Sequence, residues 1–263
     1  MPEGSTAYTF KCVVPGVQVT DETPAAAQIA KECGLRHQVV EIFWEDLEIF
    51  APVLMRRKKA PIHSIEAQIY KAALQAKQDG FDTLLFGESA DVTYGGLNSL
   101  LSKEYTVGEF IERYSFLMPH LALKHPVYAI DGFTSFECDG MIDPHRFVSN
   151  LFFCEGLHSY INACKTAGVN LAAPYAKSYL AEPIDYVRIR GGEPKYLVRE
   201  VYRRLFPDFP IPNKTPMPRP MNEWLKDWKG PVRPEFWPHC AERLNGDQKW
   251  LLWILEQYLN LTN

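Results

Sequence analysis

Two carboxylates follow directly after a short apolar run in this chain. Residues 83–86 (Thr-Leu-Leu-Phe) are typical of a buried strand, and Gly87 comes next. Glu88 and Asp91 then precede a Gly95-Gly96 pair. Glycine lets the backbone approach a ligand closely, and ligands of open α/β sheets lie beyond the carboxyl ends of strands. Carboxylates there commonly hold Mg²⁺ against phosphates. The segment predicts a ligand site, and an ordinary strand-to-helix loop is the alternative.

The composition is that of a globular protein rather than of a nucleic-acid or membrane protein. The 263 residues are 46% hydrophobic and 23% charged. A net charge of −4 gives no reason to expect a nucleic-acid partner. No apolar run approaches the roughly 18 residues of a membrane span, and residues 1–6 lack the features of a signal peptide. We therefore expect a cytoplasmic protein with no membrane partner.

An alternation of strands and helices positions the two carboxylates. The patterns predict strands over residues 8–14, 37–42 and 83–86, and helices that begin near Thr23, Trp44 and Ser64 and end at Gly34, Met55 and Gly80. His63, just before the third helix, is expected to cap or pack rather than to bind a metal. This order predicts an α/β fold with a parallel sheet covered by helices.

The second half is predicted to be mostly helical. Helices are expected after a Thr106–Glu109 capping box, from Asp143-Pro144 to about Ala167, over 194–206, and after Asp247 as a cap. Six prolines exclude a helix interior over 207–220. No linker marks a boundary, so we expect one domain over 1–263, with an α/β nucleotide-binding part (1–100) and a mainly helical part (101–263).

The carboxylate segment resembles a motif of a known family. Residues 86–96 are similar to the Ser-Gly-Glu-Gly-Ser-Asp-Glu-Leu-Phe-Gly-Gly signature of the asparagine synthase family, within the ATP pyrophosphatase superfamily. Gly87, Glu88, Asp91 and the Gly95-Gly96 pair match. The positions that depart from it are Phe86, Ser89, Ala90, Val92 and Thr93. The resemblance implies an adenine nucleotide alpha hydrolase-like fold.

Later segments extend this resemblance over roughly residues 7–225. Residues 168–175 resemble the family's Gly-Val-Glu-Ala-Arg-Val-Pro-Phe, although Asn170 and Ala172 replace its Glu and Arg. Residues 195–200 look like its Lys-x-x-Leu-Arg helix. Lys195 and Arg199 are four apart and would share a helix face. They could contact phosphate oxygens there; a solvated basic face is the alternative.

A proline-rich loop carries one more lysine of interest. Residues 212–221 stand in the place of the family's Arg-x-Lys-x-x-x-Ser-x-Gly loop, and Lys214 aligns with its lysine. A fixed ammonium would stabilise charge that develops on phosphate oxygens, and the prolines would restrict the loop. A surface lysine in a rigid loop is the alternative.

The resemblance implies an ATP-dependent amide-forming ligase of asparagine synthase type. Such an enzyme adenylates a small-molecule carboxylate, and ammonia or another amine then displaces AMP. ATP and Mg²⁺ are the implied cofactors. By resemblance, Phe86, Gly87 and Glu88 would lie near the nucleotide, Asp91 near Mg²⁺-pyrophosphate, and Lys195 and Lys214 near the adenylate. Glu88 could also accept the amine proton as a general base.

Two parts of the family's machinery have no counterpart in the printed sequence. The Ser-Gly-Gly-x-Asp-Ser phosphate loop does not occur, and Pro2 rather than the glutaminase cysteine follows Met1. By order, residues 8–14 look like the family's second strand, and loss of the central first strand would expose two strand edges.

Three explanations stay open for these differences. The chain is truncated, or a separate partner (a glutaminase, a phosphate-loop-bearing chain or another copy in a homo-oligomer) completes it, or it is a non-catalytic protein on the same scaffold. An unrelated α/β hydrolase that uses Ser89 is poorly supported, because no Gly-x-Ser-x-Gly elbow occurs.

Overall fold

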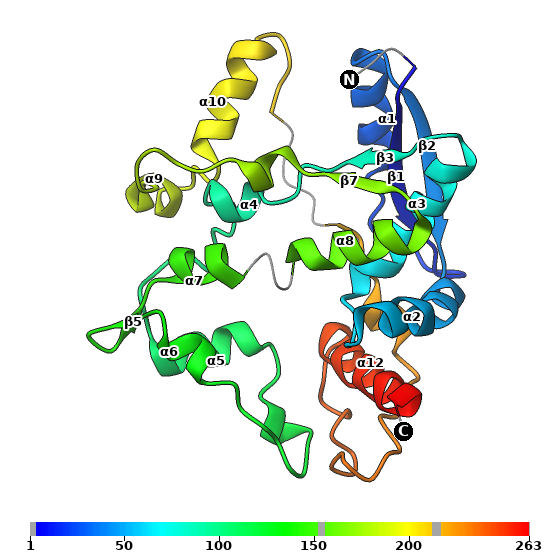
Figure 1. Cartoon of the computed structure of the whole chain (residues 1–263), viewed down its shortest axis with the longest axis vertical. Helices are drawn as coiled ribbons and strands as arrows, with labels where there is room; N and C mark the ends of the chain where they lie inside the picture. Colours follow the sequence, from blue (N-terminus) through cyan, green and yellow to red (C-terminus); the bar gives the residue numbers. More distant parts are fainter. Residues whose placement is uncertain (1–3, 152–155, 212–216, 263) are drawn as a thin grey trace.

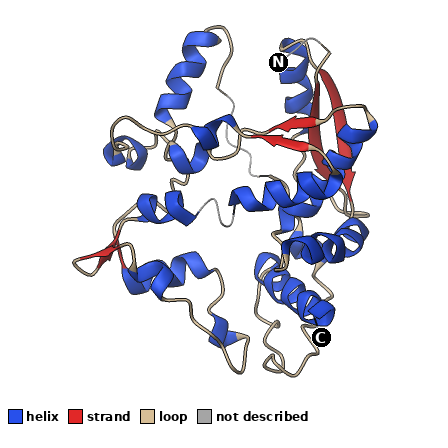
Figure 2. Ribbon diagram, in the orientation of Figure 1, coloured by secondary structure: helices blue, strands red, loops and turns tan. Residues whose placement is uncertain are grey.

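Two parallel strand pairs form the α/β part of the molecule. The computed structural model describes residues 4–151, 156–211 and 217–262. Strand β1 (Thr6–Cys12) pairs with β2 (Arg36–Ile42), and β3 (Thr83–Leu85) pairs with β7 (Asn170–Ala172). Helices cover both pairs (Figure 1; Figure 2). The predicted α/β class is confirmed. The sheet is divided, however, because among the described residues the two pairs are not hydrogen-bonded to each other.

Three helices follow β1, β2 and the loop beyond them, close to their predicted ranges. They are α1 (Thr23–Glu32), α2 (Trp44–Lys58) and α3 (Ser64–Gln78). The cap of α3 is His63, for which capping or packing was expected, and Ser64 is the first residue of the helix. The Ile65 amide donates to His63 Nδ1 over 3.3 Å, and the His63 amide donates to Glu66 Oε1 over 2.8 Å. These bonds satisfy amides that a helix start leaves without intrahelical partners.

The rest of the described chain is mainly helical, as predicted. Its helices are α4 (Ala90–Thr93), α5 (Val107–Ser115), α6 (Asp131–Thr134), α7 (Pro144–Leu151), α8 (Gly156–Ala167), α9 (Tyr186–Arg190), α10 (Tyr196–Leu205), α11 (Met221–Trp224) and α12 (Gly246–Thr262), with 3₁₀ turns η1 (Pro119–Leu121) and η2 (Pro174–Lys177). The capping box at Thr106 is confirmed.

Two local features of this half differ from the prediction. A small antiparallel sheet joins β4 (Tyr105–Thr106), β6 (Met141–Ile142) and β5 (Glu137–Cys138), and the sequence pattern did not indicate it. The cap of α12 is Asn245 instead of Asp247, since the Gln248 amide donates to Asn245 Oδ1 over 2.9 Å. Within the described ranges, none of the helices combines the length and the apolar character that crossing a membrane would require.

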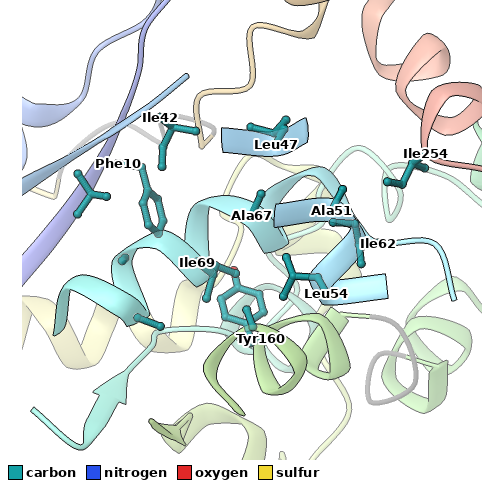
Figure 3. Close-up of a cluster of buried hydrophobic side chains, with 14 of the residues drawn as sticks. Phe10, Ile42, Leu47, Ala51, Leu54, Ile62, Ala67, Ile69, Tyr160 and Ile254 are labelled. Carbon is teal, nitrogen blue, oxygen red and sulfur yellow. The ribbon is translucent and has the colours of Figure 1, made fainter. Parts of the chain in front are cut away.

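One large hydrophobic cluster joins the parallel strands to helices from both halves. Phe10 and Ile42 come from β1 and β2, and they pack with residues of α2, α3, α8 and α12 (Figure 3). A second, aromatic cluster lies between α5 and α7, where the rings of Phe110 and Phe147 are 4.9 Å apart between centroids. The α5–α7 segment stands away from the parallel strands in Figure 1, with α8 between them.

A buried polar network crosses the large core. Glu66 of α3 is fully buried and forms an ion pair with Lys58 of α2. Asn162 of α8 donates to Glu66 Oε2 over 3.0 Å. Lys58 Nζ also donates to Ser159 Oγ over 3.2 Å. Because a buried charge is tolerated only when it is paired and hydrogen-bonded, this network constrains how the three helices pack.

The network makes a stability prediction. Glu66→Gln leaves the Lys58 ammonium without its charge partner, so we expect a loss of about 3–5 kcal/mol in the free energy of unfolding. Equilibrium urea denaturation measures it. The control is Glu193→Gln, which breaks a solvent-exposed pair with Arg188 and is expected to cost less than about 1 kcal/mol. Equal losses in the two variants would contradict the assigned role of Glu66.

Candidate active site

The turn after β3 begins with a partly buried residue, Phe86, and an exposed one, Gly87. The Phe86 amide donates to the Ala172 carbonyl over 2.9 Å, and the Phe86 ring packs edge-on against Tyr160, with centroids 5.0 Å apart. Phe86 is thus a packing residue of the core. Gly87 is exposed, and a Cβ added there would meet no atom within 4 Å. The backbone at Gly87 is open to an approaching ligand.

Glu88 and Asp91 line one cavity of about 560 Å³, the central cavity. Tyr160 of α8 is hydrogen-bonded to Glu88. Burial, and then the charges of Glu88 and Asp91, raise the pKa of Tyr160, so its hydroxyl stays protonated and donates to the carboxylate. Asp91 Oδ1 lies 3.0 Å from Lys195 Nζ. In this site the Glu88 carboxylate is therefore paired with a neutral hydroxyl, and the Asp91 carboxylate is paired with the Lys195 ammonium.

The glycine pair holds Asp91 in place. The Gly96 amide donates to the Asp91 carbonyl over 2.7 Å. A Cβ at Gly96 would lie 2.0 Å from Asp91 Oδ1, and a Cβ at Gly95 would lie 2.4 Å from Ile189 Cδ1. Gly95 also has a φ of 71°, a conformation that side chains disfavour. Only glycine at both positions lets this turn close against the carboxylate.

The structure brings two of the predicted motifs to this turn. Residues 170–172 form β7 beside β3, and the Tyr94 hydroxyl donates to Ser178 Oγ over 2.9 Å. Lys195 is the residue directly before α10, with a φ of 54°, and its side chain reaches Asp91. It precedes the helix, so the prediction that Lys195 and Arg199 lie on one helix face is wrong. Arg199 does not line the central cavity.

Several cavity residues were not predicted as site residues, and Lys214 cannot be placed. Lys214 lies outside the described residues. His63, Arg113, Phe116, Arg219 and Trp250 line the central cavity together with the carboxylates. They come from the start of α3, the end of α5, the segment before α11 and the start of α12. No local spacing in the sequence links these segments, so no motif could indicate them.

His63 lies on the cavity wall as a neutral ring. His63 keeps an exposed surface on the cavity wall, and desolvation by the surrounding atoms, with the charges of Arg219 and Lys58, lowers the pKa of its ring to about 4. Its Nδ1 already accepts the Ile65 amide. The imidazole is therefore uncharged at neutral pH, and it acts as a helix cap as predicted.

Ser89 faces a second hollow of about 480 Å³, the side pocket, which His145 and Ser178 also line. The Ser89 side chain is buried, and its Oγ has no hydrogen-bond partner among the described residues. His145 Nε2 instead contacts the Val92 carbonyl oxygen at 3.0 Å. A nucleophilic serine needs an adjacent base, so the geometry gives the hydrolase alternative no support.

The carboxylates fit a magnesium ion that arrives with phosphates. The described residues contain no group of three or more His, Cys, Asp or Glu side chains that could hold a metal ion by themselves. Mg²⁺ is usually bound by one or two carboxylates, with water and substrate phosphates as the other ligands. Glu88 and Asp91 match that pattern, and Lys195 stands where it could meet phosphate oxygens.

The fold is an α/β domain with a cavity at the carboxyl end of a parallel strand, where ligands of such folds usually bind. A family model described as asparagine synthase matches residues 4–132, which contain β1, β2, β3 and the turn with Glu88 and Asp91. This segment of the chain belongs to the asparagine synthase family. The match does not cover residues 168–175 or 195–221. No curated protein matches the chain.

The backbone at Ser89 gives one departure from the family motif an expected cost in stability, which can be tested. Ser89, which stands where the motif has glycine, has a φ of 77°. Left-handed backbone costs an L-residue roughly 1–2 kcal/mol. We expect Ser89→Gly to be more stable than Ser89→Ala by about 1 kcal/mol in urea denaturation, since both lose the hydroxyl and only glycine relieves the backbone. Equal stabilities would refute the assigned strain.

His63 makes a pH prediction. Below its ordinary pKa of about 6.5, the unfolded chain takes up a proton that the folded chain excludes until about pH 4. Stability is therefore lost as the pH falls from about 6.5 towards 4. We expect His63→Asn, which keeps a capping side chain, to lose part of this pH dependence in denaturation curves. An unchanged slope, or a titration of the His63 ring near pH 6.5 by NMR, would contradict it.

Proposed function

We propose that the chain is an ATP-dependent amide-forming ligase of asparagine synthase type. One observation carries the proposal: Glu88 and Asp91 share the wall of one cavity, and Lys195 is held against Asp91. Two carboxylates and an ammonium at the end of β3 suit a magnesium nucleotide. The family assignment of the surrounding segment supports the same chemistry.

The reaction would take two steps. A carboxylate oxygen of the substrate bonds to the α-phosphorus of ATP, and the bond from that phosphorus to the oxygen bridging to the β-phosphate breaks, which releases pyrophosphate. The nitrogen of ammonia or another amine then bonds to the activated carbonyl carbon, and AMP leaves. When bound, Mg²⁺ would neutralise charge on the phosphates.

The residues of the turn would have distinct roles. Glu88 would take the proton that the amine loses, and its hydrogen bond with Tyr160 would keep the carboxylate oriented during the transfer. Lys195 would be placed by Asp91 to stabilise the charge that develops on phosphate oxygens. The open backbone at Gly87 would let the nucleotide approach the end of the strand. Lys214 is proposed as a second cation for the same charge.

Metal-dependent nucleotide binding tests the proposal. We expect calorimetric titration of the full chain to show binding of Mg-ATP that Asp91→Asn weakens at least tenfold, because a magnesium ligand is lost. Removing Mg²⁺ with EDTA should weaken ATP binding by the unchanged protein to a similar extent. It should weaken ATP binding by Asp91→Asn little further. Glu242→Gln, which removes an exposed carboxylate that does not line the central cavity, serves as the matched control.

Pyrophosphate release supplies the second readout. The carboxylate is unidentified, so the probes are aspartate and a panel of aromatic and aliphatic carboxylates, each with ammonium. We expect release with at least one of them and loss of release in Asp91→Asn. A folded chain that neither binds Mg-ATP nor releases pyrophosphate would overturn the proposal.

A second candidate function is a binding protein that works only with a partner chain. Within the described residues the parallel strands form two pairs that are not hydrogen-bonded to each other. This favours the second function, since a further strand from another polypeptide could join them. The phosphate-loop sequence of the family is also absent from the printed residues. This function predicts a folded chain that does not bind Mg-ATP alone, which is the outcome that would contradict the ligase.

A further inference from the structure

We propose that the central cavity accepts a carboxylate with a bulky apolar skeleton and a second anionic group, rather than a small polar amino acid. The inference rests on the proposed function and names its substrate class. The carboxylate to be activated would lie at the turn that carries Glu88 and Asp91, with its charge towards the Lys195 ammonium. The skeleton would lie on an apolar wall, and the second anion would lie beside two arginines.

The wall beyond the carboxylates is largely apolar. Leu97 and Leu100 continue the chain from the Gly95-Gly96 turn, and Phe116, Trp250 and Leu251 face the same cavity from α5 and α12. Apolar surface is favourably buried only against apolar ligand surface. At about 560 Å³ the cavity lies within the usual range for sites that enclose a whole organic ligand. A short polar acid would leave this wall in contact with water.

Phe116 is held at the cavity in an uncommon conformation. Its φ is 60° and its ψ is −41°, and 55% of its surface is exposed. Gln248 of α12 donates from Nε2 to the Phe116 carbonyl over 2.9 Å. Strained backbone of this kind costs about 1–3 kcal/mol and persists where surrounding contacts fix it. The strain and the exposure together present an aromatic ring to a ligand.

Two guanidinium groups in the cavity have unused hydrogen-bonding capacity. Arg219 Nη1 donates to Ser64 Oγ and Arg113 Nη2 to Ser99 Oγ, each over a long 3.4 Å. Neither arginine has an ion pair within the described ranges, although Asp247 also lines the cavity. An arginine presents five donors that match a carboxylate or phosphate. The arginines therefore favour an anionic group on the ligand.

A buried donor points to the same kind of ligand group. Trp250 is buried and lines the cavity, and its indole Nε1 has no hydrogen-bond partner among the described residues. Buried donors normally find an acceptor, so one without a partner calls for an explanation. An acceptor oxygen on a bound ligand would supply it.

Three probes separate the parts of this proposal. Succinate has two carboxylates and little apolar surface, 3-phenylpropionate has one carboxylate and a ring, and 2-benzylsuccinate has both features. Calorimetric titration of the full chain should show that 2-benzylsuccinate binds at least tenfold more tightly than either of the others. Equal affinity of succinate and 2-benzylsuccinate would overturn the apolar part of the proposal.

Matched variants then locate the contacts. Phe116→Ala should weaken both aromatic probes at least fivefold and leave succinate unchanged, whereas Phe206→Ala, an exposed ring on the end of α10, should change none of them. Arg219→Gln and Arg113→Gln should each weaken 2-benzylsuccinate about tenfold and 3-phenylpropionate less than twofold. Arg203→Gln on α10 is their control. Thermal unfolding confirms that each variant is folded.

The remaining outcomes distinguish this inference from the proposed function. If no probe binds, or if Phe116→Ala weakens Mg-ATP but not 2-benzylsuccinate, the cavity does not take such a carboxylate and the inference fails while the ligase proposal stands. If 2-benzylsuccinate binds as expected but Mg-ATP does not, the cavity assignment stands and the ligase proposal fails.

Discussion

The burial of one carboxylate, that of Glu66, constrains how the molecule packs. Its charge must be compensated inside the core, and its partners come from α2, from the residue before α3 and from α8. The same group of residues reaches the central cavity, because His63 and Ser159 both line it. A single electrostatic requirement therefore constrains both the packing of three helices and two residues of the cavity wall. A change at this position would disturb the site without touching a ligand.

The carboxylate turn links the parallel strands to the outer helices. The geometry of this turn depends on close packing, because the Gly96 backbone lies so near Asp91 that no side chain would fit between them. Asp91 in turn fixes Lys195 ahead of α10, and Tyr160 supports Glu88 from α8. The side chains that would meet a nucleotide are thus oriented by contacts with other residues of the site. Such support is what keeps a site preorganised before its ligand arrives.

The elements of this structure that depend on residues close together in the sequence could be predicted from it. The strands and helices of the first part have local signals, and Glu88 and Asp91 lie within one turn. His63 and Ser64 were both reasonable candidates for the cap of α3, because a histidine can accept the same bond as a serine. The division of the parallel strands could not be predicted, since pairing depends on remote residues. The roles of Arg113, Phe116 and Trp250 in the cavity could not be predicted either, because these residues meet only when helices distant in the sequence have packed together.

The central cavity is assembled from the start of α3, the turn after β3, the end of α5 and the start of α12. Bringing segments so far apart in the chain into contact has an entropic cost that only the packed fold offsets. The cavity therefore exists only when nearly the whole chain is native. Any ligand that fills it will be coupled by mass action to global unfolding rather than to a local opening. Occupancy should be visible as a rise in melting temperature, even for compounds that are never turned over.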